Sequence, residues 1–223
     1  MSDWRAFVTL VGKDVAVERR THQALAVMLI FSLLVLVVLS FALELRVENA
    51  RQVAPGALWV ALAFASVLGL NRSLAQERDD GCLEGLMLAP IERSTLFAAK
   101  AAANLLFLAA IGAILLPVST VLLGVNLLRA DLALVVFLGA VGLSTAGTLL
   151  ATMAAHTRAR EVLLPVLLLP LSVPLLIAGA KATAGLLDGG GMATVGAWLR
   201  LLAGFDVAWA AASYLVSAYV LAE

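Results

Sequence analysis

The chain has 223 residues, of which 63% are hydrophobic and 13% are charged, and its formal net charge is zero. Soluble domains carry about 45–50% apolar and about 25% charged residues, so a water-soluble chain of this length could not bury so much apolar surface. The composition therefore excludes an ordinary soluble domain, and the neutral charge gives no electrostatic reason to expect a nucleic-acid or acidic partner.

Residues 1–20 predict an amphipathic helix. Apolar side chains recur at helical spacing (Trp4, Phe7, Val8, Val11 and Val15), and the polar side carries Asp3, Arg5, Lys13, Asp14, Glu18 and Arg19. Such a helix lies in the membrane interface with its apolar stripe at the headgroup boundary. A simple surface anchor and a helix that docks a partner protein are equally good interpretations.

Six apolar stretches follow that are long enough for transmembrane helices, each of which needs about 20 residues. The runs are continuous and not alternating, so they predict helices and not barrel strands. They are Gln23 to Leu43, Gln52 to Asn71, Ala101 to Leu128, Leu132 to Ala155, Val162 to Ala180 and a shorter Val207 to Ala222, with Arg200 and Asp206 just before the last. The fold class predicted is an all-α membrane protein, with residues 1–223 forming one transmembrane domain.

Basic residues are unevenly divided between the two sides of the predicted bundle. One side holds Arg5, Lys13, Arg19, Arg20, Arg72, Arg78, Arg93, Lys100, Arg158 and Arg160, and the other holds Arg46, Arg51, Arg129, Lys181 and Arg200. Because cytoplasmic segments carry the excess of lysine and arginine, the N-terminus and the second-to-third and fourth-to-fifth connections are predicted to be cytoplasmic. With six spans, the C-terminus is cytoplasmic as well.

The connection between the second and third spans, residues 77–93, predicts a short amphipathic helix. Its apolar side carries Cys82, Leu83, Leu86 and Met87, with Gly81 before it and Pro90 ending it. Two interpretations remain open from composition alone. The helix could lie on the lipid headgroups, or a motor protein could push on it.

Polar and helix-breaking residues occur at unusual places in and beside the spans. Asn71 and Arg72 close the second span, where Arg72 is predicted to pair with Glu77 in preference to contacting a substrate. The fifth span carries three prolines that kink a helix, Pro165, Pro170 and Pro174. The glycine-rich segment from Lys181 to Arg200 is predicted to be periplasmic, and a flexible loop is one interpretation of it.

No pattern in the chain predicts catalysis. A GxxxxGK[ST] phosphate loop is absent from the sequence, and no acid–base pair or nucleophile constellation stands out. The single Cys82 excludes a disulfide framework within the chain and any CxxC metal or redox site. The chain is therefore predicted not to be an enzyme, and any ATP hydrolysis must come from a separate subunit.

The connection between the second and third spans, residues 77–93, also carries a sequence pattern. This pattern resembles the first cytoplasmic loop of permeases in the six-helix ABC exporter family. The matching positions are Glu77, Arg78, Gly81, Leu83, Glu84, Leu86, Pro90 and Arg93. Three further motifs are similar to the haem exporter B (CcmB) family of cytochrome c maturation. They are Ala54-Pro55-Gly56-Ala57-Leu58-Trp59-Val60, Leu70-Asn71-Arg72-Ser73, and Arg158-Ala159-Arg160-Glu161-Val162-Leu163-Leu164-Pro165 continued by Pro170 and Pro174.

The resemblance implies a permease subunit that works in haem delivery, with residues 77–93 as the coupling helix. It also implies a re-entrant or interfacial helix in the segment from Lys181 to Arg200, which is as good an interpretation as the flexible loop. Implied partners are a CcmA-like ABC ATPase, a CcmC-like haem-handling membrane protein, a CcmD-like small membrane subunit and, indirectly, a haem chaperone, with two permease copies per complex in the bacterial inner membrane. Haem enters as cargo and not as a cofactor, since His22, His156 and Cys82 lie at cytoplasmic helix ends or in the loop. Two alternatives stay open: a non-transporting scaffold that relays ATPase motion, and a permease for another exported substrate.

Overall fold

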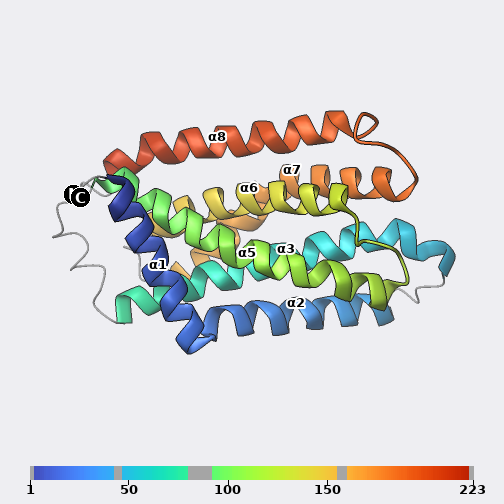
Figure 1. The fold of residues 1–223 in the computed structure, drawn as a ribbon, viewed down its shortest axis with the longest axis horizontal. Coiled ribbons are helices and arrows are strands. Elements are labelled where there is room, and N and C mark those ends of the chain that lie inside the picture. The colour runs from blue at the N-terminus through green and yellow to red at the C-terminus, as the bar shows by residue number, and fades with distance from the viewer. Residues whose placement is uncertain (1–2, 43–46, 80–91, 155–159, 221–223) are drawn as a thin grey trace.

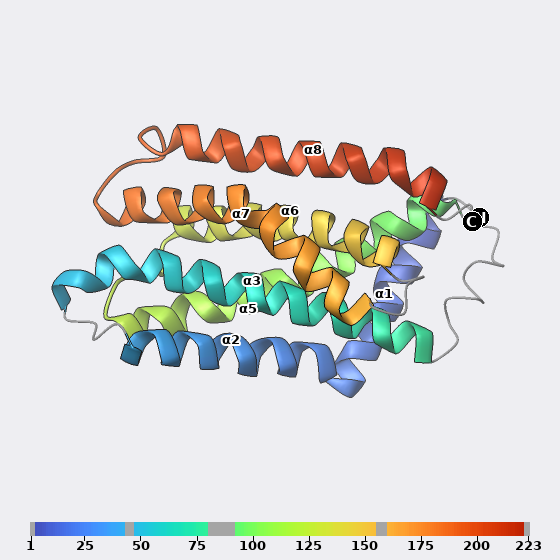
Figure 2. The same ribbon diagram turned by 180° about the vertical axis from the view of Figure 1, so that it is seen from behind.

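In the computed structural model, which describes residues 3–42, 47–79, 92–154 and 160–220, the chain is a bundle of helices. The helices of this described part are α1 (Asp3–Thr21), α2 (Gln23–Ala42), α3 (Val47–Asp79), α5 (Arg93–Leu123), α6 (Ala130–Ala154), α7 (Arg160–Leu187) and α8 (Gly196–Val220). Figure 1 and Figure 2 show α2 to α8 running side by side along the long axis, with α1 lying obliquely across one end.

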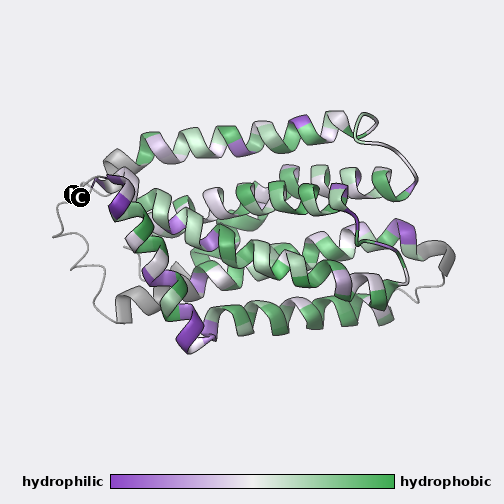
Figure 3. Cartoon of the chain, viewed as in Figure 1, coloured by the Kyte–Doolittle hydropathy of each residue, from purple (hydrophilic) through white to green (hydrophobic). Residues whose placement is uncertain are grey.

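Six of these helices are long and apolar enough to cross a membrane, which confirms the predicted number of spans. They are Gln23–Ala42, Ala50–Asn71, Ser94–Leu123, Ala130–Ala154, Val162–Leu187 and Gly196–Val216. Figure 3 shows the same division, with hydrophobic colour along the bundle and hydrophilic colour concentrated on α1 and near the helix ends. The chain is an all-helical multi-pass membrane protein.

The predicted limits of the third span were wrong by several residues. The helix begins at Arg93 and ends at Leu123, where Gly124 has a φ of 65° and stops it in the left-handed conformation that glycine adopts without strain. After this cap, the Thr120 hydroxyl accepts a hydrogen bond of 3.0 Å from the Leu127 backbone N–H. Apolar composition continues past the glycine, so hydropathy alone did not reveal the turn.

The prediction for the segment from Lys181 to Arg200 was also wrong in extent. Most of it is helix: α7 continues to Leu187 and α8 starts at Gly196, which leaves only residues 188–195 as the connection. α7 stops in a Schellman motif, since Gly189 has a φ of 87° and Gly190 N–H donates to the Gly185 carbonyl at 3.0 Å. Lys181 is tolerated because it is exposed near the helix end, where a long cationic side chain can reach the interface.

The core of the bundle is organised around the indole of Trp59 on α3. A Cβ at Gly139 of α6 or at Gly179 of α7 would overlap the Trp59 ring, so both glycines make room for it. The indole N–H donates a 3.0 Å hydrogen bond to the hydroxyl of Thr183 on α7. Trp59 therefore joins three helices, and close approach at small residues is how membrane helices pack without a hydrophobic driving force.

Candidate functional site

Helix ends gather at the end of the bundle that α1 crosses (Figure 1), and two of them flank the predicted coupling segment in the sequence. They are the last turn of α3 at Asp79, the start of α5 at Arg93, the end of α6 at Ala154, the start of α7 at Arg160 and the end of α8. The opposite end holds the connections from α2 to α3, α5 to α6 and α7 to α8. This is the arrangement expected from the division of basic residues.

The structure places only part of the predicted coupling residues. Glu77 and Arg78 lie in the last turn of α3 and Arg93 is the first residue of α5, but their side chains are outside the described part. Gly81, Leu83, Glu84, Leu86 and Pro90 lie outside the described residues altogether, as do His156 and Cys82. The coupling role of these residues stays a prediction.

The continuity of α3 bears directly on that role. α3 is a single helix of 33 residues, which is about 50 Å long at 1.5 Å per residue, while the apolar core of a bilayer is about 30 Å thick. The helix therefore extends well beyond its apolar span and carries Glu77 and Arg78 on the same rigid element as Trp59. A displacement at the Asp79 end can reach the centre of the bundle without crossing a loop.

The residues that close the second span lie on this same helix. Asn71 is half-buried, and the side chain of Arg72 lies outside the described part, so the predicted pair between Arg72 and Glu77 stays a prediction.

An ion pair between α1 and α5 bridges 86 residues of sequence. Lys100 Nζ of α5 lies 2.6 Å from an Asp14 carboxylate oxygen, and the two side chains are only 11% and 12% exposed. Ala6 and Leu10 are buried on the same helix, whereas Trp4 is 72% exposed. The predicted polar side of residues 1–20 is therefore wrong at Asp14, which faces the bundle and not the solvent.

Glu18 also turns inward, where it fixes the corner between α1 and α2. Its carboxylate accepts hydrogen bonds from the backbone N–H groups of Ala24 at 3.3 Å and Leu25 at 2.8 Å, in the first turn of α2. A carboxylate in this position satisfies otherwise unpaired donors and meets the positive end of the helix dipole. His22 forms the corner itself, with a φ of 51°. It is exposed, so it faces away from the bundle interior.

The interior of the bundle holds polar groups that sequence reasoning did not single out. Asn104 of α5 donates a 3.0 Å hydrogen bond to Thr148 of α6. Beside this pair, Met28, Ser66 and Ser144 help to line a cavity of about 10 Å³, which is about the space of one water molecule. Among the described residues, no group of three or more histidine, cysteine, aspartate or glutamate side chains could hold a metal ion.

Asp206 is the one acidic residue of α8, and it lies inside the sixth span. It is 8% exposed, and its Oδ1 atom is buried without a hydrogen-bond partner. The sequence prediction placed Asp206 outside this span, because the apolar run was started after it. Burial of a charged aspartate at a helix centre costs about 2.5–3.5 kcal/mol on insertion scales. A predicted span that began at Gly196 would have included Asp206 and would have revealed an acidic residue within the membrane.

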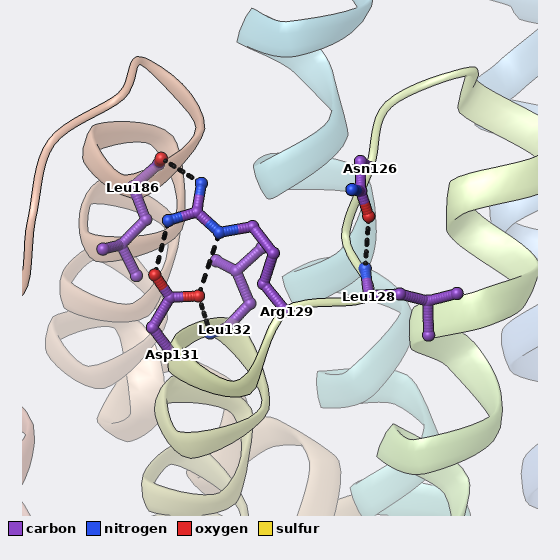
Figure 4. A network of polar contacts seen from close by, with 6 residues as sticks. All are labelled: Asn126, Leu128, Arg129, Asp131, Leu132 and Leu186. Carbon is purple, nitrogen blue, oxygen red and sulfur yellow. Dashed lines mark hydrogen bonds and ion pairs between the residues drawn. The ribbon is translucent and has the colours of Figure 1, made fainter.

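The opposite end of the bundle is joined by Arg129, in the connection between α5 and α6 (Figure 4). Its guanidinium forms a two-pronged pair with Asp131, at 3.1 Å from Nε and 2.5 Å from Nη2, and donates through Nη1 to the Leu186 carbonyl at 2.9 Å. Asp131 Oδ1 also accepts from the Leu132 backbone N–H at 2.9 Å, which caps the first turn of α6. Arg129 thus ties this connection to the end of α7.

Residues 5–222 match the family described as CcmB protein, which is nearly the whole chain. The chain belongs to the CcmB protein family. It is similar to three proteins named "Heme exporter protein B". The relative from Bradyrhizobium diazoefficiens is 28% identical over 82% of this chain and 83% of its own length. Those from Rhodobacter capsulatus and Paracoccus denitrificans are 31% and 32% identical, over 77% and 78% of this chain and 79% and 80% of their own lengths.

The resemblance predicted from the motifs around Trp59 and Pro165 is confirmed by this match. The matched range also contains residues 77–93 and Asp206. In this CcmB family member, the two ends of the bundle are therefore built differently. One end carries α1 and the helix ends at Asp79 and Arg93, and the other is tied together by Arg129.

Replacing Arg129 with alanine is expected to lower the free energy of unfolding by about 1 kcal/mol. The pair with Asp131 is partly exposed, with 37% and 21% of the two side chains accessible, and such pairs contribute about 0–1 kcal/mol. Arg129→Lys should recover less than half of this stability, because a lysine cannot make the two-pronged interaction. Thermal unfolding in detergent measures both variants, and an Arg129→Lys protein as stable as the parent would contradict the geometry.

Proposed function

We propose that this chain is the permease subunit of an ABC transporter complex for haem delivery in c-type cytochrome biogenesis. The observation that carries the proposal is the family match over residues 5–222, together with relatives that bear the name "Heme exporter protein B". Six candidate membrane spans support a permease. Residues 1–223 act as one permease domain, and the ATPase activity belongs to a CcmA-like partner subunit.

In this proposal, residues 77–93 form the coupling helix that contacts the ATPase. ATP binding closes the ATPase dimer and displaces this segment. The displacement passes along α3, a continuous helix of 33 residues, to Trp59. Because Trp59 packs on Gly139 of α6 and Gly179 of α7, motion of α3 is transferred to both of these helices.

The complex contains two copies of the chain, with a CcmC-like haem-handling protein, a CcmD-like small subunit and, indirectly, a haem chaperone. It lies in the bacterial inner membrane with both termini in the cytoplasm. The excess of basic residues on one side supports this orientation. So does the location of α1 and of the α3 and α5 helix ends together at that side of the bundle.

Haem transport and motion relay are separated by one experiment on the purified complex. The complex is reconstituted in sealed vesicles, and haem movement across the bilayer is followed with and without ATP. The transporter proposal expects ATP-dependent haem accumulation on the opposite side. ATP-dependent release of haem-loaded chaperone without haem movement would replace it with the scaffold alternative. ATP-dependent movement of a different substrate and not of haem would favour a permease of another specificity.

The coupling segment is tested by reversing one charge and by placing a charge at one apolar position. Glu84→Lys and Leu86→Asp are expected to lower ATPase stimulation by about tenfold, because disrupting a side chain at the centre of an interface costs on the order of 1–2 kcal/mol. The measurements are ATPase pulldown and ATP hydrolysis by the complex. Asp188→Lys is the matched control for Glu84→Lys, since it makes the same change in charge at an exposed position in the α7–α8 connection. If the Glu84 and Leu86 variants bind the ATPase and stimulate ATP hydrolysis as well as the parent protein does, residues 77–93 are not the coupling helix.

A further inference from the structure

Asp206 lies at the centre of a membrane span. It is ten residues from the start of the 25-residue helix α8 at Gly196 and fourteen residues from its end at Val220, so about 15 Å and about 21 Å of helix separate it from the two ends. That depth is the middle of an apolar layer about 30 Å thick. The side chain points into the bundle and away from lipid, because the residue is only 8% exposed while its neighbour Val207 is 69% exposed.

The surroundings of this carboxyl group are closely packed. A Cβ on Gly142 of α6 would lie 2.5 Å from Asp206 Oδ1 and would overlap a methyl group of Leu175 on α7. The absence of a side chain at Gly142 is therefore what makes space for the carboxyl group between α6, α7 and α8. Its Oδ1 atom has no hydrogen-bond partner in this space.

In the described part of the chain, no basic side chain faces Asp206 to neutralise it. α8 packs on α5, α6 and α7, and the facing stretches 101–123, 132–154 and 162–180 contain no ionisable residue. On α8 itself, the neighbouring ionisable groups are Arg200 and Tyr214. Both are exposed, and Arg200 donates back to the Gly196 carbonyl. A buried acid without a cation is held in its neutral, protonated form.

A second polar group on the same face of α8 shares this isolation. Ser213 follows Asp206 by seven residues, which returns a helix to nearly the same direction. It is 2% exposed, and its hydroxyl oxygen is also buried without a partner. The face of α8 that packs on the bundle therefore carries two polar groups whose hydrogen-bonding capacity is unused, and this capacity would be satisfied by water if α8 moved outward.

We propose that Asp206 is a proton-binding site at the middle of the membrane, which releases its proton to water when α8 separates from Gly142 of α6 and takes it up again when they close. The step breaks the carboxyl O–H bond, leaves the electron pair on the carboxylate and transfers the proton to a water molecule. The closed packing described here is the protonated form. This site does not depend on the identity of the exported cargo.

The first test uses dicyclohexylcarbodiimide, an apolar reagent that modifies protonated carboxyl groups within membranes. The full chain is reconstituted in vesicles of phosphatidylethanolamine and phosphatidylglycerol, and modification of Asp206 is measured by mass spectrometry from about pH 5 to about pH 9. We expect modification that falls by about tenfold or more as the pH rises, and none at this position in Asp206→Asn. Modification that is independent of pH would overturn an exchangeable proton, and absence of modification at every pH would overturn the opening of α8 that gives the reagent access to the carboxyl group.

The second test follows the opening of α8 directly. In a Cys82→Ser background, Ser213→Cys introduces a thiol at the buried face, and its alkylation by N-ethylmaleimide is measured over the same pH range. We expect protection at acid pH and faster alkylation at alkaline pH with Asp206. In the Asp206→Asn background, which mimics the neutral acid, the thiol should stay protected at every pH. Its alkylation should then rise with pH only as far as ionisation of the thiol itself requires. The same pH profile in both backgrounds would overturn the link between the proton and the packing of α8.

Discussion

Replacing Trp59 with alanine is expected to lower the free energy of unfolding by about 3–5 kcal/mol, the usual cost of deleting a large buried aromatic side chain. Trp59 is 2% exposed and fills the space that Gly139 and Gly179 leave open. An alanine would leave a cavity between three helices and would also leave the Thr183 hydroxyl without its 3.0 Å hydrogen bond. Reversible unfolding in mixed detergent micelles measures the decrease.

Two comparisons separate packing from the hydrogen bond at this position. Thr183→Val keeps the side-chain shape beside the ring but removes the acceptor of the indole N–H, so it should cost about 1–2 kcal/mol. Gly139→Ala places a Cβ that would overlap the indole, whereas Gly204→Ala on α8 meets nothing within 4 Å. Gly139→Ala should therefore destabilise the bundle, and Gly204→Ala should be neutral or slightly stabilising. Equal effects of the two alanines would contradict the packing described here.

Replacing Lys100 with alanine is expected to release α1 from the bundle. The Asp14–Lys100 pair is nearly buried and has a separation of 2.6 Å, and removing one partner of a buried pair costs about 3 kcal/mol. That energy corresponds to an increase of about 100-fold in the population of detached α1. Trypsin cleavage after Arg19 or Arg20, followed by mass spectrometry of the N-terminal fragment, measures the detachment.

Lys13 supplies the matched control for this prediction. Lys13 also pairs with Asp14, at 3.2 Å, but its side chain is 37% exposed. Lys13→Ala should therefore change the cleavage rate by less than about fivefold, because exposed pairs contribute about 0–1 kcal/mol. If both lysine variants release α1 equally, the energy of docking comes from charge alone and not from the buried pair. The combined exchange Asp14→Lys with Lys100→Asp should restore part of the docking.

The number of spans and their general limits could be predicted from the sequence because the requirement is one-dimensional. A bilayer demands about 20 consecutive apolar residues in helix whatever surrounds them. The second span and the start of the first were placed within two residues, as Ala50–Asn71 and Gln23–Ala42. The amphipathic helix of residues 1–20 also followed from periodicity, and it is found as Asp3–Thr21.

Two of the predictions that were wrong concern residues whose neighbours in space are distant in sequence. Asp14 was placed on the solvent side, although Lys100, 86 residues away, draws it inward. Asp206 was placed outside the sixth span, although a glycine on α6 makes a space for it within the bundle. In each case a charged residue was judged by its own segment, while its energy depends on another helix.

Composition, run length and local motifs were enough to establish a six-span helical membrane protein and to indicate the CcmB family, because each of these properties can be read along the chain. The packing of the helices was needed to show that Trp59 joins α3 to α6 and α7, that Glu18 and Asp14 hold α1, and that Asp206 is buried at the centre of the membrane. Lipid solvates every apolar helix face almost equally well, so hydropathy does not select which helices meet. The meeting points are selected by shape at glycines such as Gly139 and Gly142 and by pairing of a few polar groups, and both exist only once the helices are packed.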